Sequence, residues 1–349
     1  MTWAEALLGP ALKAGDHARR FLAEGPLRPP PGPVQWSVPG EVVLRRPGME
    51  LRDFSVPGAA GTPLLIVAPE VNGAHIADFG EGQSLVRTVR DGGFPRVALT
   101  VWTSADASTR HHTVDDSIAS ILEAIDHLGG RVHLLGICQG GWESAVVAAL
   151  RPDAVATLTL VAAPIDFHAS GGLMHATARA TPAAGYRALV GLGGGVMRGD
   201  VLRRAFDSLR PVERPWVEWA RLWTSLDDPD FLERTRRLEA WYGAEKNLPG
   251  GMYMQAVGEL FGENRLIRGD LVVLGRRVDL AAVTCPLALI AGERDHITPP
   301  PQVWAAEAAM SSPKVLRCTV DAGHVGVFIG RRALREDWPP ILAWLRAAA

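Results

Sequence analysis

The sequence predicts an α/β fold with a mostly parallel sheet, helices on both faces and a helical lid insertion. From Glu41 onward, short apolar runs alternate with segments of helical character, which is the pattern of strand-helix units in a parallel sheet. Several of these runs are apolar throughout, as expected for strands buried on both faces. The alternation stops after Pro164 and resumes after Leu280. We therefore expect an insertion between two strands of the sheet.

Each element of the sheet is predicted from an apolar run bounded by turn residues, and each helix from apolar residues at helical spacing. The predicted strands are Glu41–Arg45, Leu51–Val56, Leu64–Ala68, Val97–Trp102, Val132–Ile137, Thr157–Ala163, Leu287–Ala291 and Val315–Val320. The predicted helices are Gly82–Asp91, Val114–Leu128, Trp142–Leu150, Pro301–Met310 and Asp337–Leu345.

Three regions follow from this pattern. Residues 1–33 are predicted to form an amphipathic helix and a stiff Pro-rich linker, Gly25–Pro33. Residues 34–163 and 281–349 form the α/β core, and residues 164–280 form the lid. The helix within residues 1–24 has two open interpretations: it packs against the main body, or it forms a contact surface for a partner or a hydrophobic particle.

Within the predicted lid, two features bear on function. Trp216, Trp219 and Trp223 recur at helical spacing, which indicates a buried stripe or, alternatively, a groove for an apolar acyl chain. The glycines between Gly191 and Gly195 follow no predicted strand. They do not match a dinucleotide-binding motif and are interpreted as a flexible loop.

Composition excludes several functional classes. The 349 residues carry a net charge of -2 and are 47% apolar, so a basic surface for nucleic acid is not expected. The three cysteines are too few and too scattered for a disulfide framework. Neither a signal peptide nor a membrane span is predicted, and we expect a cytoplasmic protein. The histidines lack the spacing of metal ligands, so no metal site is predicted.

Cys138 is the most informative residue. It lies in Gly136-Ile137-Cys138-Gln139-Gly140-Gly141, between a predicted strand and a predicted helix. This arrangement resembles the nucleophile elbow of the α/β-hydrolase fold, with cysteine in place of the usual serine. The glycines Gly136 and Gly140 are expected because strand and helix pass closely on either side of a nucleophile in a strained turn. The alternative is a buried structural cysteine at a strand end.

An acid and a histidine follow in the order that this fold requires. Asp295 comes directly after the predicted strand Leu287–Ala291, and His324 comes after Val315–Val320. The carboxyl ends of parallel strands meet at one edge of a sheet, where catalytic groups cluster. The sequence therefore predicts a catalytic triad of Cys138, Asp295 and His324.

Further motifs resemble the polyhydroxyalkanoate synthases, and most of all the short catalytic subunit of the two-component type. The resemblance runs from about Ala68 to the C-terminus and is most specific in the elbow hexapeptide and in Gly275-Arg276-Arg277-Val278-Asp279-Leu280. The other matching segments begin at Pro69, Gln83, Val114, Pro164, Glu239, Glu263, Asp295 and Gly323.

This resemblance implies transfer of 3-hydroxyacyl groups from coenzyme A thioesters to Cys138 and then to the hydroxyl end of a polyester. Coenzyme A is then part of the substrate, and no cofactor is expected. By fold geometry, the backbone N–H groups of Gln139 and Val71 are the predicted oxyanion hole. Residues expected to contact substrate are Asn72, His75, Trp102, Trp241 and His296.

Departures from the family pattern lie around the mouth of the predicted site. Gly73 and His75 stand where the family usually has a basic residue and a tyrosine, Val101 replaces an aspartate, and so does Ala244. Two rival functions therefore stay open: a polyhydroxyalkanoate or thioester hydrolase with the same triad, and a non-catalytic granule-associated or partner subunit. The family also implies a homodimer formed through the lid. The need for an activating partner subunit and a location on the surface of polyester granules both stay open.

Overall fold

The computed structural model describes residues 3–25, 35–170, 177, 180–208 and 214–349. The chain divides into two compact units. One comprises residues 1–34 and 203–244, and the other comprises residues 35–202 and 245–349. The predicted Pro-rich linker lies largely outside the described residues.

The larger unit is built on one eight-stranded sheet with the strand order β1-β2-β4-β3-β5-β6-β11-β12. β1 and β2 pair antiparallel, as do β2 and β4, and every other pair is parallel. The strands are β1 (Glu41–Arg46), β2 (Met49–Asp53), β3 (Leu64–Val67), β4 (Val97–Trp102), β5 (Val132–Ile137), β6 (Val155–Val161), β11 (Leu287–Gly292) and β12 (Val315–Val320). All eight predicted strands are thus present, and together they form this sheet.

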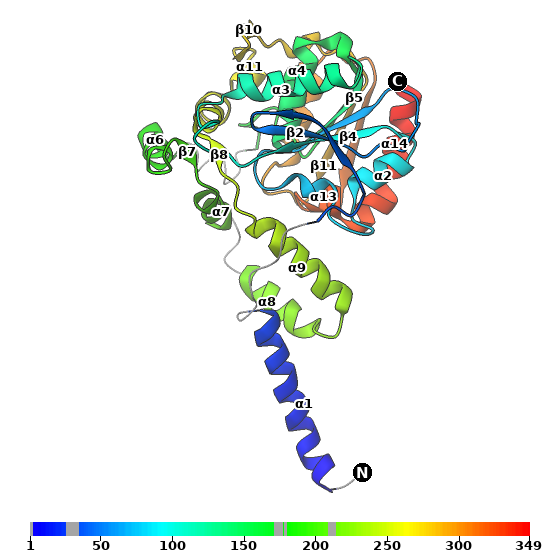
Figure 1. Cartoon of the computed structure of the whole chain (residues 1–349), viewed down its shortest axis with the longest axis vertical. Coiled ribbons are helices and arrows are strands. Elements are labelled where there is room, and N and C mark those ends of the chain that lie inside the picture. The colour runs from blue at the N-terminus through cyan, green and yellow to red at the C-terminus, as the bar shows by residue number, and fades with distance from the viewer. Residues whose placement is uncertain (1–2, 26–34, 171–176, 178–179, 209–213) are drawn as a thin grey trace. The chain divides into compact units, whose positions relative to one another are not determined.

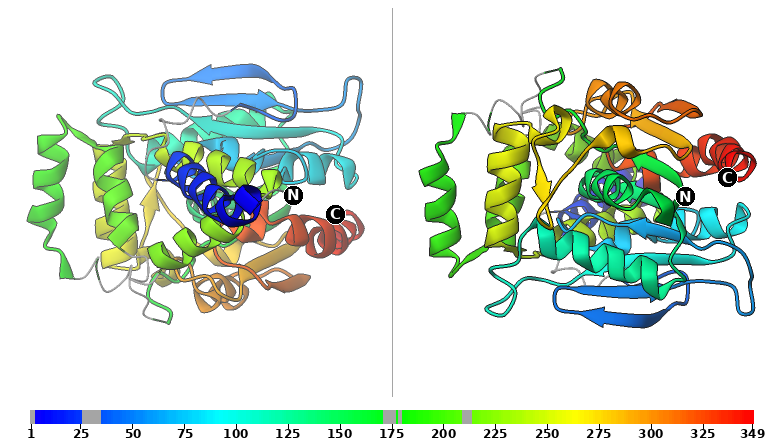
Figure 2. Two further views of the ribbon diagram at one scale, coloured as in Figure 1. Left: turned by 90° about the horizontal axis from the view of Figure 1, so that it is seen from below. Right: turned by 90° about the horizontal axis from the view of Figure 1, so that it is seen from above.

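Helices cover both faces of the sheet. α2 (Leu85–Asp91) and α14 (Trp338–Ala348) lie together on one face, and α3 (Val114–His127) and α4 (Gln139–Leu150) lie on the other (Figures 1 and 2). α12 (Pro300–Ala309) packs on β11. Every residue of β3, β5, β6 and β11 is buried, and the polar exceptions to their apolar character are His133, Thr157 and Thr159. The prediction of a mostly parallel sheet with helices on both faces is therefore confirmed.

The helix starts follow local capping chemistry. Ser84 accepts a hydrogen bond from the Arg87 N–H at 2.9 Å, so α2 begins at Leu85 and not at the predicted Gly82. Thr113 and Asp116 form a capping box at the start of α3, with the Thr113 N–H donating to Asp116 Oδ2 at 2.7 Å. α4 begins at Gln139, directly after Cys138, and therefore three residues before the predicted start.

The remaining elements of the larger unit are short. They are α6 (Ala183–Leu192), β7 (Val196–Met197), β8 (Leu248–Pro249), α10 (Gly250–Gln255), α11 (Arg265–Arg268), β9 (Val272–Val273), β10 (Arg276–Arg277) and α13 (Gly326–Ile329), with π-helical turns at Ala256–Gly262 and Ala333–Asp337. α7 (Gly199–Ser208) crosses the boundary between the two units in sequence. The predicted glycine loop is corrected at its start, because Gly191 belongs to α6 and the turn begins at Gly193.

The smaller unit consists of α1 (Trp3–Glu24), α8 (Arg214–Thr224) and α9 (Pro229–Gly243). The ring of Phe21 packs edge-on against Trp219 at 5.4 Å and against Trp223 at 5.2 Å between centroids. Leu222, Leu226 and Leu232 form a small core. The tryptophan spacing correctly predicted a helix, but the buried-stripe interpretation was wrong for Trp219 and Trp223, which are 41% and 43% exposed. No helix in the described part of the chain combines the length and apolar character needed to cross a membrane.

Candidate active site

Cys138 occupies the junction between β5 and α4 with a backbone conformation that L-residues rarely adopt. Its φ is 53° and its ψ is -116°, where the side chain is crowded against its own backbone. Its N–H donates to Val161 O at 2.9 Å, and its carbonyl oxygen accepts from the Gly141 N–H at 2.9 Å. Neighbouring strand and helix therefore impose this conformation from both sides. The half-buried thiol stands at the carboxyl edge of the sheet.

The elbow glycines are required by close backbone approach. A Cβ on Gly136 would lie 2.3 Å from Gly140 O, and a Cβ on Gly140 would lie 2.2 Å from Val67 O. Both obstacles are backbone atoms, which cannot rotate away as a side chain does. The prediction made from the sequence pattern for these two glycines agrees with this geometry.

Asp295 and His324 reach the same edge of the sheet from the loops after β11 and β12. His324 Nδ1 and Asp295 Oδ2 are 2.7 Å apart, with the two residues 8% and 5% exposed. The other carboxylate oxygen, Oδ1, accepts hydrogen bonds from the N–H groups of Ile297 and Thr298, each at 2.9 Å. These bonds fix the carboxylate, so that one oxygen is directed at the imidazole.

Cys138 and His324 interact through their side chains. Burial alone would lower the pKa of His324, but the neighbouring Cys138 and Asp295, with hydrogen bonds to both, outweigh burial and raise it to about 10. The structure therefore brings together all three residues of the predicted triad, with the imidazole between the thiol and the carboxylate. Both neighbours therefore favour the protonated form of the imidazole.

The two predicted oxyanion donors lie on separate elements. Gln139 is the first residue of α4, so its N–H has no acceptor within the helix. Val71 follows β3 in a loop and is half-buried. In the described part of the chain, the backbone N–H of Val71 has no hydrogen-bond acceptor.

The predicted substrate residues occupy different settings. Trp102 is 6% exposed and its indole N–H donates to Ala68 O at 2.9 Å, which supports the end of β3. His75 stacks on Trp36 with 4.0 Å between ring centroids, and burial lowers its pKa.

The other three differ in exposure and location. Asn72 adopts a left-handed φ of 65°, which asparagine tolerates better than most residues. His296 is exposed beside Asp295. Trp241 belongs to α9 of the helical unit, where it is buried.

The sequence interpretation missed a buried group of charged residues near the elbow, Glu70, Glu143 and Lys246. Glu70 is 4% exposed and Glu143 is 0% exposed. Lys246 is half-buried as a residue, yet its Nζ is shielded from solvent and has no hydrogen-bond partner in the described structure. A signal was available, because Lys246 is one of only three lysines in the chain.

Burial shifts the protonation of all three groups. It raises the pKa of Glu70, against the opposing effects of the Ser117 hydrogen bond and the Lys246 charge. Burial, followed by the charge of Glu70, raises the pKa of Glu143 well above its ordinary value. Burial lowers the pKa of Lys246 to about 7, although both carboxylates favour its charged form. Among the described residues, no group of three or more His, Cys, Asp or Glu side chains is arranged to hold a metal ion.

Comparison with known proteins gives consistent results. Residues 61–341 match the model of a family described as a protein of unknown function (DUF3141). The chain is 31% identical over 300 residues to a poly(3-hydroxyalkanoate) polymerase subunit of Allochromatium vinosum, covering 84% of this chain and 83% of that protein. It is 30% identical over 297 residues to the corresponding subunit of a Synechocystis species, covering 81% of this chain and 77% of that one.

Solved structures share the fold. A hydrolase from Pseudomonas aeruginosa aligns with a TM-score of 0.54 at 17% identity, covering 88% of this chain and 98% of that chain. An esterase from Thermogutta terrifontis also aligns with a TM-score of 0.54, at 18% identity, covering 88% of this chain and 97% of that chain. At these identities the likeness identifies the fold, which is that of the α/β hydrolases.

Proposed function

This chain belongs to the poly(3-hydroxyalkanoate) polymerase subunits and to the family described as a protein of unknown function (DUF3141), and we propose that it polymerises 3-hydroxyacyl groups through a thioester on Cys138. Family membership makes it an acyltransferase-type enzyme of polyhydroxyalkanoate synthesis. The observation that carries the chemical proposal is the His324 imidazole, which lies 2.7 Å from Asp295 and also interacts with Cys138.

In the first step, His324 accepts the thiol proton of Cys138, and the resulting thiolate attacks the carbonyl carbon of a 3-hydroxyacyl-coenzyme A. A new carbon–sulfur bond forms, the bond to the coenzyme A sulfur breaks, and the leaving thiolate takes the proton held by His324. Exchange of one thioester for another keeps the acyl group activated. Asp295 orients the imidazole and stabilises its positive charge, as the carboxylate does in other nucleophile-histidine-acid triads.

In the second step, the terminal hydroxyl of the growing chain attacks the acyl-enzyme. His324 accepts the hydroxyl proton, an ester bond forms, and the bond to Cys138 breaks. In both steps the carbonyl oxygen acquires negative charge. The N–H groups of Gln139 and Val71 would stabilise this charge, and one such donor contributes on the order of 10²- to 10³-fold in rate.

The decisive experiment measures coenzyme A release from 3-hydroxybutyryl-coenzyme A by the purified protein and separates the products into polymer and free acid. We expect polymer from the wild type, and neither polymer nor thiol release from Cys138→Ala. Free 3-hydroxybutyrate without polymer would indicate a hydrolase. If no thiol is released, the assay is repeated with acyl-coenzyme A substrates of other chain lengths and with a candidate partner subunit. These repeats test whether the enzyme needs another substrate or an activating partner.

A further inference from the structure

The two proposed oxyanion donors must reach the same oxygen although they lie on different elements. Gln139 begins α4, and Val71 lies in the loop after β3. Oxyanion stabilisation depends on donors held near 3 Å from the developing charge before the reaction begins. An interaction that fixes the loop against the start of the helix would therefore control the rate of acyl transfer.

The side chain of Gln139 provides this link. Its Oε1 accepts a hydrogen bond from the Glu70 N–H at 3.3 Å, and Glu70 directly precedes Val71 in the chain. One residue thus carries the first donor on its backbone and fixes the position of the second donor through its side chain.

Glu143 determines how the Gln139 amide is oriented. It lies one turn further along α4, and its Oε1 accepts a hydrogen bond from Gln139 Nε2 at 2.9 Å. The other acceptor near Nε2 is Met252 Sδ at 4.0 Å, and a thioether sulfur is a weak acceptor. Holding Nε2 towards Glu143 leaves Oε1 directed at the loop. Glu143 Oε2 has no hydrogen-bond partner in the described structure. In that structure, the bond from Gln139 is therefore the one side-chain hydrogen bond of the Glu143 carboxylate.

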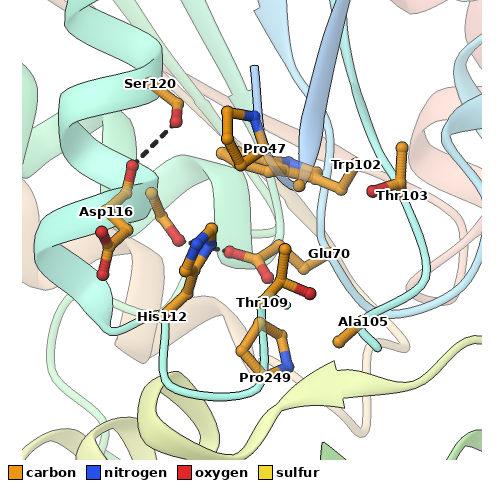
Figure 3. Close-up of a pocket in the computed structure, with 12 residues that line it drawn as sticks. Pro47, Glu70, Trp102, Thr103, Ala105, Thr109, His112, Asp116, Ser120 and Pro249 are labelled. Carbon is orange, nitrogen blue, oxygen red and sulfur yellow. Dashed lines mark hydrogen bonds between the residues drawn. The ribbon is translucent and has the colours of Figure 1, made fainter. Parts of the chain in front are cut away.

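The loop is also fixed from its other side. The Glu70 carboxylate accepts a hydrogen bond from Ser117 Oγ of α3 at 2.6 Å. Figure 3 shows Glu70 with Trp102 and His112 around a cavity of about 10 Å³, which is about the space that one water molecule needs. The backbone of Glu70 is thus held between α3 and α4, and Gln139 is its contact with α4.

We propose that Glu143 is a positioning residue for acyl transfer, which acts through the Gln139 side chain to hold the N–H groups of Val71 and Gln139 at a fixed separation. This inference rests on the proposed function, because it assumes that Cys138 forms an acyl-enzyme. Glu143 itself does not touch the substrate. Since a misplacement of about 1 Å can cost on the order of 100-fold in rate, loss of Glu143 should slow acylation by about 10- to 100-fold.

The experiment compares two reactions of Cys138 that differ in their need for an oxyanion hole. In acylation by p-nitrophenyl butyrate, the sulfur forms a thioester, the ester carbon–oxygen bond breaks and p-nitrophenolate leaves. That reaction passes through an oxyanion. Alkylation by iodoacetamide displaces iodide and involves no oxyanion. The half-buried Cys285 and Cys318, whose pKa values burial raises, react slowly with iodoacetamide and leave Cys138 as the fast site.

We expect Glu143→Leu to slow the p-nitrophenolate burst 10- to 100-fold and to leave the rate of Cys138 alkylation within about two-fold of wild type. Glu143→Gln keeps an oxygen acceptor and should stay within about three-fold in both reactions. Thr157→Val is the matched control, because it removes a buried 3.0 Å hydrogen bond to His133 near the amino ends of β5 and β6. It should lower stability without a change in either rate.

A second variant keeps the test valid if Glu143→Leu does not fold. Gln139→Ala leaves Glu143 in place, and it should slow acylation as much as Glu143→Leu does. The double variant should be no slower than either single variant, because both remove one link. Acylation within two-fold of wild type in these variants, or an equal fall in acylation and alkylation, would overturn the positioning role. A wild-type protein that is alkylated at Cys138 but is acylated neither by p-nitrophenyl butyrate nor by any 3-hydroxyacyl-coenzyme A, with or without a partner subunit, would instead refute the proposed function.

Discussion

The backbone strain at Cys138 leads to a stability prediction of unusual sign. Replacing Cys138 by alanine removes the thiol but keeps the Cβ at a φ of 53° and a ψ of -116°. Replacing it by glycine removes both. Comparison of Cys138→Ala with Cys138→Gly therefore isolates the cost of holding a Cβ in this conformation, without the interaction between the thiol and His324.

The magnitude follows from three terms. Strain at a position of this kind costs on the order of 1–3 kcal/mol. Two effects of glycine offset part of the relieved strain. Glycine stabilises the unfolded chain by about 0.4–1 kcal/mol through its conformational freedom, and loss of the half-buried methyl group of alanine costs a few tenths of a kcal/mol more. We expect Cys138→Gly to be more stable than Cys138→Ala by about 1 kcal/mol.

Urea denaturation of the two variants measures this difference. With a slope of about 1–3 kcal/mol per molar urea, the transition midpoint of Cys138→Gly should lie about 0.3–1 M above that of Cys138→Ala. The control is Ala343→Gly, an exposed position inside α14, where glycine should be the less stable residue by about 1 kcal/mol. A loss of stability at position 138 that matches the control would refute the argument that the elbow is strained.

Three further predictions test the same region. Gly140→Ala should destabilise the fold by about 1–3 kcal/mol in thermal denaturation, because its Cβ would lie 2.2 Å from a carbonyl oxygen of β3. The control is Gly191→Ala, which should be neutral or stabilising because its Cβ would have no atom within 4 Å. NMR titration should show that the pKa of the His324 imidazole in the wild type lies well above its ordinary value. Cys138→Ala should lower that pKa, because the interaction with Cys138 favours the protonated imidazole, and equal titration in both proteins would contradict the pairing. Burial lowers the pKa of Lys246 to about 7 in the folded protein from an ordinary 10.5, so the unfolded chain binds more protons between these two pH values. The free energy of unfolding of the wild type, relative to that of Lys246→Met, should therefore rise from pH 7 to pH 9. Denaturation at both pH values measures this difference, and a constant difference would refute the prediction.

The parallel sheet was predictable from the sequence because its strands are buried on both faces. Runs such as Leu287–Gly292 are apolar without alternation, and few other structures need that pattern. Asp295 and His324 were predictable because each follows a predicted strand, and topology brings the carboxyl ends of parallel strands to one edge. The glycines two positions before and after Cys138 predicted the sharp turn between β5 and α4.

The pairing of distant segments was not predictable in the same way. Residues 1–34 and 203–244 form one unit, but the contact of Phe21 with Trp219 and Trp223 joins segments far apart in the sequence, and no local pattern encodes it. Amphipathic spacing predicts a helix, yet it does not identify which surface that helix covers.

Glu143 was missed for a different reason. A single glutamate in a helix is usually exposed, and the buried position is evident only when α4 is seen packed beneath the elbow. Gln139 was selected for its backbone N–H, which the elbow motif implies. The role of its side chain depends on the separation between the loop after β3 and the start of α4, and one sequence does not contain that information.

The close backbone contacts at Gly136 and Gly140 also bear on how the catalytic chemistry of this fold can change. The conformation of residue 138 is imposed by β5, α4 and the neighbouring backbone, and the sulfur atom has no part in it. The nucleophilic side chain at this position can therefore be exchanged by a single codon change, while the backbone that orients it stays the same. A hydrolase and an esterase at 17% and 18% identity share this fold with the chain, so the fold that surrounds the turn tolerates wide change in sequence.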